Sequence, residues 1–189
     1  MIKKIAIIGP ESTGKSTLSK QLAEHFHTLW CPEYAREYLL QNGIEYNYDD
    51  LLKIAQGQLV MEDYCESVVM DQFSAKNSES PIHNPLLFID TNMYVMKVWY
   101  EYVFGRCDQL VLNEITTRSY DLYLLCKIDL PWIAEPMREY PDEKSRMELY
   151  NMYKDILINQ KTSWSEISGT YNERLQKAID AVMMHCVAQ

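Results

Sequence analysis

The apolar positions of this chain follow two alternating patterns. Short unbroken apolar runs predict strands buried on both faces of a parallel sheet at residues 5–8, 86–89 and 122–126, and short β-prone runs predict two further strands at residues 28–31 and 164–167. Between them, apolar residues recur every three to four positions, which predicts helices over residues 15–26, 33–42, 48–73, 92–104, 108–118, 147–158 and 171–186. This alternation predicts an α/β fold: a five-stranded parallel sheet with helices on both faces.

Two segments interrupt the pattern. Residues 76–81 form a polar cluster that is typical of a loop. Residues 129–146 contain three prolines and mixed charges, which a packed core would not use. We expect the second segment to be a mobile lid on a single domain that spans residues 1–189.

Composition narrows the class of protein. The 189 residues, 24% charged and 47% hydrophobic, suit one globular domain, and no apolar run approaches the ~20 residues that cross a bilayer. Met1 leads directly into the first strand without a signal-peptide pattern, so we expect a cytoplasmic protein with no membrane partner. The net charge of −9 argues against a nucleic-acid surface. Five widely spaced cysteines suggest neither a disulfide framework nor a zinc site.

The strongest motif lies between the first strand and the first helix. Residues 9–16 match G-x-x-x-x-G-K-[ST], the P-loop whose backbone N–H groups surround a triphosphate. Lys15 is expected to reach the β- and γ-phosphates, and the Ser16 hydroxyl to hold Mg²⁺. ATP and Mg²⁺ are therefore the expected cofactors. The candidate nucleotide contacts in this loop are Gly9, Glu11, Ser12, Thr13, Gly14, Lys15, Ser16 and Thr17.

Two acidic residues follow the second and third strands, whose carboxyl ends meet at the same edge of a parallel sheet. Glu33 could accept a proton from a substrate hydroxyl, or simply favour the start of a helix. Asp90 could bind Mg²⁺, directly or through water, or cap the next helix. Arg36, one helical turn after Glu33, could pair with it or bind a phosphate.

The proline-rich segment adds two candidates. Arg138 could fold over phosphates, as mobile arginines in lids do, or stay solvated. Trp132 could stack on a planar ligand, anchor the lid or pack at its rim.

Together these segments resemble the ribosylnicotinamide kinase domain of NadR-type proteins, over nearly the whole chain. The resemblance rests on GPESTGKSTL, PEYAREYL, FIDT, the Trp132-to-Arg138 pattern and the late GTYNER. It implies a P-loop kinase that phosphorylates the 5′-hydroxyl of nicotinamide riboside. It also implies roles for individual residues. The catalytic residues would be Lys15, Glu33, Asp90 and Arg138, and the metal would be bound by Ser16 and Asp90. The substrate would be bound by Glu33, Tyr34, Arg36, Asp90 and Trp132, and Tyr171 would lie beside the nucleotide.

One departure leaves the acceptor open. Where the family usually carries an acidic pair and a glycine, this chain has Ala134, Glu135 and Pro136, and proline restricts how a lid closes. Kinase action on another nucleoside or a nucleotide, and a nucleotide-binding switch without kinase activity, both stay open. So does homo-oligomerisation. The adenylyltransferase and DNA-binding segments of full NadR proteins are missing, so we do not expect this chain alone to regulate transcription.

Overall fold

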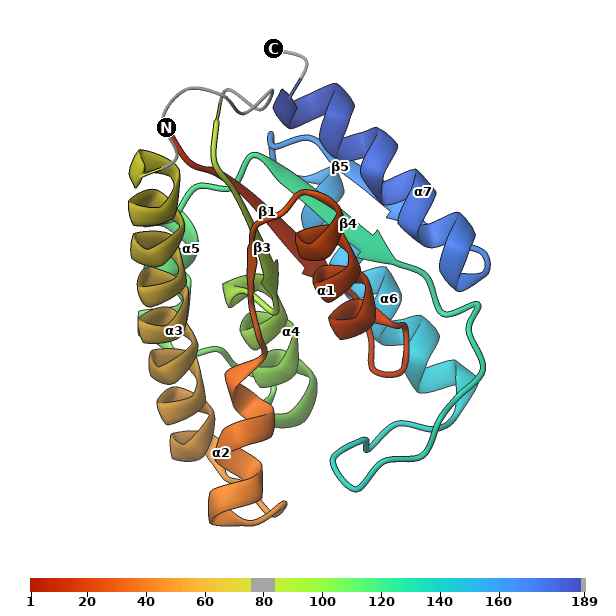
Figure 1. Ribbon diagram of the computed structural model, residues 1–189. Helices are drawn as coiled ribbons and strands as arrows, with labels where there is room; N and C mark the ends of the chain where they lie inside the picture. The colour runs from red at the N-terminus through yellow and green to blue at the C-terminus, as the bar shows by residue number, and fades with distance from the viewer. Residues whose placement is uncertain (76–83, 188–189) are drawn as a thin grey trace.

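The computed structural model describes residues 1–75 and 84–187, and its strands form one parallel sheet (Figure 1). The sheet has the order β2-β3-β1-β4-β5. The strands are β1 (Lys3–Ile8), β2 (Leu29–Cys31), β3 (Leu86–Asp90), β4 (Leu122–Cys126) and β5 (Trp164–Ile167). The expected five-stranded α/β fold is confirmed, whereas the loop expected at residues 76–81 lies outside the described residues.

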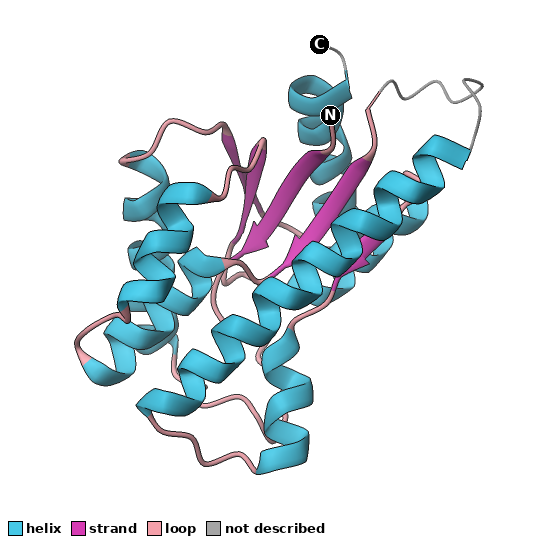
Figure 2. Ribbon diagram, turned by 90° about the vertical axis from the view of Figure 1, so that its left-hand side faces the viewer, coloured by secondary structure: helices cyan, strands magenta, loops and turns pink. Residues whose placement is uncertain are grey.

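Helices cover both faces of the sheet (Figure 2). They are α1 (Lys15–His25), α2 (Tyr34–Asn42), α3 (Tyr48–Ala75), α4 (Met93–Phe104), α5 (Gln109–Thr117), α6 (Glu143–Ile158) and α7 (Tyr171–Val182). On one face, Leu22 of α1 and Val182 of α7 pack with Ile7. On the other, α3, α4 and α6 pack over Ile8. Because successive residues of β1 are buried on opposite faces of the sheet, residues 5–8 of the strand are all apolar.

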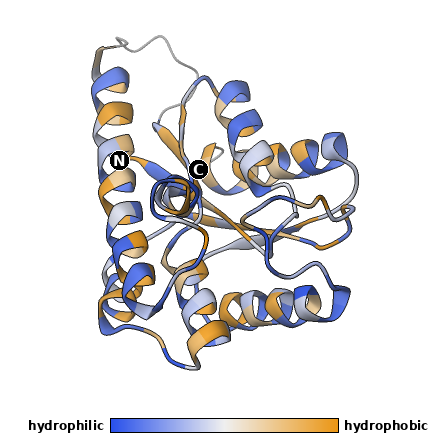
Figure 3. Ribbon diagram, turned by 90° about the horizontal axis from the view of Figure 1, so that it is seen from below, coloured by the Kyte–Doolittle hydropathy of each residue, from blue (hydrophilic) through white to orange (hydrophobic). Residues whose placement is uncertain are grey.

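Hydrophilic and hydrophobic residues alternate along the helices that surround the sheet (Figure 3), as their 3.6-residue period predicted. Helices α2, α3, α4 and α5 share a further apolar cluster, which includes Leu39, Ile54 and Met96. This cluster builds a helical wall beyond the carboxyl end of β2. None of the described helices is both long and apolar enough to cross a membrane.

One helix boundary corrects the sequence-based expectation. Helix α6 begins at Glu143 rather than at residue 147, because the Asp142 side chain accepts a hydrogen bond from the backbone N–H of Ser145 and caps the helix. The expected lid of residues 129–146 therefore loses its last turn to α6. We call residues 127–142 the β4–α6 segment. At the other end of the chain, α7 stops at Val182 and a π-helical turn, Met183–Val187, follows.

Candidate active site

The P-loop connects β1 to α1 in a conformation that its glycines permit. Gly9 has a φ of 140°, and a Cβ there would stand 2.7 Å from the carbonyl oxygen of Cys126. Gly14 has a φ of 76° and occupies the N-cap of α1 without a side-chain capping bond. The first amides of α1 therefore stay available to an anion at the helix N-terminus.

Hydrogen bonds inside the molecule hold the P-loop in this shape. Lys15 Nζ donates to the carbonyl oxygen of Pro10 at 2.9 Å, and Thr13 Oγ1 donates to the same oxygen at 2.7 Å. Arg174 of α7, only 2% exposed, donates to the carbonyl oxygens of Thr13 and Lys127 at 3.0 and 2.9 Å. Arg174 belongs to the GTYNER motif, but the sequence alone predicted no role for it. Its role is to fix the P-loop to the end of β4.

Two carboxylates stand at the carboxyl ends of adjacent strands, as expected, and among the described residues neither side chain makes a helix-capping hydrogen bond. Glu33 is the N-cap residue of α2, but its side chain makes no capping bond. Asp90 is buried at the end of β3, and Asn92 caps α4 instead, accepting from the backbone N–H of Tyr94. The alternative that Asp90 caps the next helix is therefore wrong, whereas the position of Glu33 at the start of α2 still fits a carboxylate favoured by the helix dipole.

The two carboxylates interact electrostatically. Burial raises the pKa of Asp90 to about 6, and the nearby charge of Glu33 adds to this rise. Lys15, the Ser16 hydroxyl and Arg36 act in the opposite direction. Asp90 is thus close to the P-loop cation on one side and to Glu33 on the other.

The surroundings of Asp90 suit a magnesium ion. Asp90 Oδ1 is buried and has no hydrogen-bond partner among the described residues, and the Ser16 hydroxyl lies beside the same carboxylate. Oxygen ligands of this kind are those that Mg²⁺ prefers. Across residues 1–75 and 84–187, no group of three or more His, Cys, Asp or Glu side chains could hold a metal alone. A bound Mg²⁺ would therefore take its remaining ligands from phosphates and water.

Backbone strain marks the same edge of the sheet. Thr91, directly after Asp90, has a φ of 78°, which a β-branched residue rarely adopts. Its hydroxyl is buried, and no group in the part of the chain that the structure describes forms a hydrogen bond with it. Such strain is concentrated at functional sites, where the surrounding structure enforces it.

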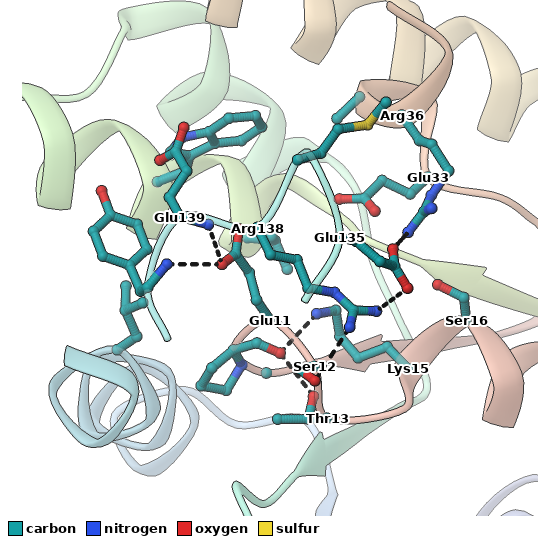
Figure 4. Close-up of a pocket in the computed structure, with 18 of the residues that line it drawn as sticks. Glu11, Ser12, Thr13, Lys15, Ser16, Glu33, Arg36, Glu135, Arg138 and Glu139 are labelled. Atoms are coloured by element: carbon teal, nitrogen blue, oxygen red, sulfur yellow. Dashed lines mark hydrogen bonds and ion pairs between the residues drawn. The ribbon is translucent and has the colours of Figure 1, made fainter. Parts of the chain in front are cut away.

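The β4–α6 segment is docked on the P-loop (Figure 4). Glu11 Oε2 accepts hydrogen bonds from the backbone N–H groups of Glu139 and Tyr140, at 2.9 and 3.3 Å. Ser12 Oγ accepts from the backbone N–H of Ile133 at 2.9 Å and from Arg138 at 3.2 Å. The side chains of Glu11 and Ser12, which the sequence predicted to contact the nucleotide, therefore bind protein groups in this structure.

Trp132 packs near two arginines of the same region. The guanidinium carbons of Arg138 and Arg146 stand 6.0 and 5.5 Å from the centre of its ring. Arg146 is buried at the start of α6, and one of its nitrogens contacts the carbonyl oxygen of Ser12 at 3.5 Å. This arrangement matches the anchoring alternative for Trp132, and Arg146 is a contact that sequence reasoning missed.

A cavity of about 450 Å³ lies between the P-loop, α2, α4 and the β4–α6 segment. Its charged lining comprises Glu11, Lys15, Glu33, Arg36, Glu135, Arg138 and Glu139. Its apolar and aromatic lining includes Leu39, Ile44, Val95, Trp99, Tyr102 and Tyr153. Sequence reasoning gave no site role to this aromatic wall, because apolar positions on helices resemble core positions.

Four of the predicted site residues lie outside the cavity lining. The Tyr34 ring packs against Gly57 of α3, Trp132 packs against arginines, and Asp90 is buried beneath the cavity wall. Tyr171 lies next to Gly14, where an added Cβ would stand 3.5 Å from the Tyr171 ring. Of these four residues, Tyr171 is thus the neighbour of a P-loop glycine.

Comparisons with known proteins identify relatives of this chain. Residues 4–174 match a family model described as AAA domain. The trifunctional NAD biosynthesis/regulator protein NadR of Escherichia coli K12 is 27% identical over 186 residues, which cover 96% of this chain and 42% of that protein. NadR of Salmonella typhimurium LT2 is 26% identical with the same coverage. The chain thus spans less than half the length of these curated relatives.

Solved structures share the fold. A crystal structure of a NadR protein in complex with NR has a TM-score of 0.68 and 24% identity, covering 97% of this chain and 50% of that one. A thymidylate kinase from Ehrlichia chaffeensis has a TM-score of 0.62 and 16% identity, covering 96% of this chain and 98% of that one. A deoxyadenosine kinase from M. mycoides has a TM-score of 0.52 and 15% identity, covering 96% and 99%.

The similarity to NadR that the motifs indicated is confirmed, and the fold is that of P-loop kinases. Because the family model covers residues 4–174 of 189, the chain belongs to the AAA domain family.

Proposed function

We propose that this chain is an ATP-dependent kinase that phosphorylates the 5′-hydroxyl of a nucleoside, with nicotinamide riboside as its acceptor. The observation that carries the proposal is the position of Glu33. Its carboxylate lines the cavity without capping α2, next to the strand that ends in Asp90 and in the same cavity as Lys15. A nucleotide switch has no need of an uncommitted carboxylate at this point, whereas a kinase needs one near the acceptor hydroxyl.

The donor side of the cavity suits a triphosphate. The amides at the start of α1 and the Lys15 ammonium would bind the phosphates, and Arg138 would close over them from the β4–α6 segment, which we propose acts as a lid. When bound at Ser16 and Asp90, Mg²⁺ would neutralise charge on the phosphate oxygens. Lys15 now contacts only the Pro10 carbonyl among the hydrogen bonds of the described residues, so turning toward a phosphate costs it a single hydrogen bond.

The acceptor side suits a nucleoside. Glu33 would take the proton of the 5′-hydroxyl while that oxygen bonds to the γ-phosphorus and the bond to the β–γ bridging oxygen breaks, releasing ADP. Leu39, Val95, Trp99 and Tyr102 would surround the planar base. Glu33 is the preferred base, because it lines the cavity whereas Asp90 is buried behind it.

The relatives support this acceptor class without fixing it. A NadR structure holds NR, and the fold also serves one kinase named for a nucleoside and another named for a nucleotide. The acceptor must therefore be tested with both kinds of compound.

The test is ADP release from Mg-ATP with a panel of nucleosides and their 5′-monophosphates, with product masses measured and a Lys15→Ala protein as the background control. We expect nicotinamide riboside to give the fastest turnover and a product that has gained one phosphate. If no nucleoside raises ADP release above background, the proposal is wrong. Tight GTP binding with slow hydrolysis that ignores every acceptor would instead identify a switch.

A further inference from the structure

The carboxylate of Glu135 holds two arginines of the cavity at once. Its Oε2 lies 3.1 Å from Arg36 and its Oε1 lies 2.7 Å from Arg138 (Figure 4). Arg36 belongs to α2 on the acceptor side, whereas Arg138 belongs to the β4–α6 segment on the donor side. One acidic side chain therefore neutralises a cation at each end of the place where phosphoryl transfer would occur.

The backbone fixes Glu135 in this position. The N–H of Arg138 donates to the carbonyl oxygen of Glu135 at 3.0 Å, which closes a four-residue turn with Pro136 at its second position. Proline presets its own φ there and restricts the residue before it to extended conformations. Glu135 and Arg138 are thus presented on the same turn, three residues apart. The Glu-Pro sequence that departs from the family pattern builds this turn.

The charges of the cavity give the pairing a consequence. Among the described residues that line the cavity, the cations are Lys15, Arg36 and Arg138, and the carboxylates are Glu11, Glu33, Glu135 and Glu139. A bound triphosphate would engage Lys15 and Arg138. Arg36 is then the remaining cation of this set that could bind a phosphate on the acceptor, and it already forms an ion pair with Glu135.

A phosphate monoester carries nearly two negative charges at neutral pH. In this cavity it would meet the carboxylates of Glu33 and Glu135, and it would have to displace Glu135 from Arg36. A 5′-hydroxyl carries no charge and requires no such displacement. Building repulsion against the wrong ligand is a common source of specificity.

We propose that Glu135 is the residue that selects an unphosphorylated acceptor, by occupying Arg36 and thereby excluding nucleoside 5′-monophosphates from the acceptor site. This inference rests on the proposed function for the identity of the acceptor site, and it names the class of acceptor that the site rejects. The same repulsion acts on the phosphorylated product and weakens its binding.

The experiment measures binding rather than turnover, so that it can fail independently of the proposed function. Calorimetry on the protein saturated with Mg-ADP would titrate nicotinamide mononucleotide, AMP and TMP, and the matching nucleosides, into the native protein and Glu135→Gln. We expect Glu135→Gln to bind the monophosphates about tenfold more tightly and the nucleosides within about threefold of native. Absence of ADP release in the panel would refute the proposed function alone.

Two further variants separate specific pairing from general charge. Adding Arg36→Gln to Glu135→Gln should abolish the gain in monophosphate affinity, because the phosphate then has no free arginine to meet. Glu139→Gln removes the same charge from the same cavity. The native Glu139 carboxylate accepts a hydrogen bond from the Tyr46 hydroxyl at 2.8 Å, so this variant should give a smaller gain in monophosphate affinity. An unchanged monophosphate affinity in Glu135→Gln, a gain that survives Arg36→Gln, or an equal gain in Glu139→Gln would each overturn the inference.

Discussion

The P-loop residue Glu11 and the backbone of Glu139 are joined by a hydrogen bond of 2.9 Å, in which the carboxylate accepts. The same oxygen accepts a second bond from the N–H of Tyr140. Burial between the two segments raises the pKa of Glu11, and the two N–H donors offset this only in part. The contact that docks the β4–α6 segment on the P-loop is therefore sensitive to pH.

The first prediction follows from the sign of this shift. An acid whose pKa is raised on folding contributes stability that is present below its ordinary pKa, which is 4.5 for Glu11, and that is lost as pH rises through the raised value. Glu11→Gln does not titrate at this position, so its Tm should rise relative to native as the pH increases from 4.5 through the raised pKa of Glu11. Glu24→Gln, on the exposed side of α1, serves as the charge control. A Tm difference that stays constant with pH would contradict the prediction.

The second prediction concerns Gly57 and Tyr34. A Cβ on Gly57 would stand 2.0 Å from the Tyr34 ring, so Gly57→Ala forces the ring out of its place between α2 and α3. We expect a loss of about 1–3 kcal/mol in the free energy of unfolding. In a Tyr34→Ala background the clash is absent, and the same substitution should stabilise by up to about 1 kcal/mol through helix propensity. Urea unfolding of the four proteins measures both values, and equal effects in the two backgrounds would refute the steric explanation.

The sheet and the P-loop could be predicted because their physical causes are local. Strands buried on both faces give unbroken apolar runs, and the loop that binds phosphate needs glycines at fixed spacing. Glu33 and Asp90 were also predictable as neighbours, because parallel strands bring their carboxyl ends to one edge. Each of these inferences used only short segments and one rule of topology.

The contacts of the β4–α6 segment could not be predicted in this way. Glu135 and Arg36 are 99 residues apart, and their pairing depends on how the segment docks. The first turn of α6 is polar, so the hydrophobic pattern does not indicate it, although the Asp142 cap begins the helix there. Buried arginines such as Arg146 and Arg174 look like solvated ones in a sequence, since burial of a charge depends on partners that only the fold supplies.

The third prediction isolates Lys15. Its ammonium contacts a backbone carbonyl of the P-loop rather than the core, so Lys15→Ala should leave the Tm within a few degrees of native. Loss of the charge that would meet the β- and γ-phosphates should lower kcat/KM by about 10³-fold or more. Lys20→Ala, on the exposed side of α1, is the matched control and should retain activity. Near-native turnover by Lys15→Ala, or its failure to fold, would show that the residue has another role.

The fourth prediction separates the two carboxylates. If Glu33 is the base, Glu33→Gln keeps the shape of the side chain but cannot take a proton, so kcat should fall by roughly 10²–10⁴ with the KM for ATP nearly unchanged. If Asp90 holds Mg²⁺ directly or through water, Asp90→Asn should weaken metal binding, and raising the Mg²⁺ concentration should recover part of the lost rate.

A Mg²⁺ titration of both variants distinguishes these roles. The buried oxygen of Asp90 and its proximity to Ser16 favour a metal effect at Asp90, whereas the place of Glu33 in the cavity wall favours proton transfer to Glu33. Partial rescue should therefore appear for Asp90→Asn and be absent for Glu33→Gln. Burial, together with the charge of Glu33, raises the pKa of Asp90 to about 6, closer to the neutral range in which a base works well, so the reverse result also has a defined meaning. Rescue of Glu33→Gln but not of Asp90→Asn would make Asp90 the base and Glu33 the residue that binds the metal.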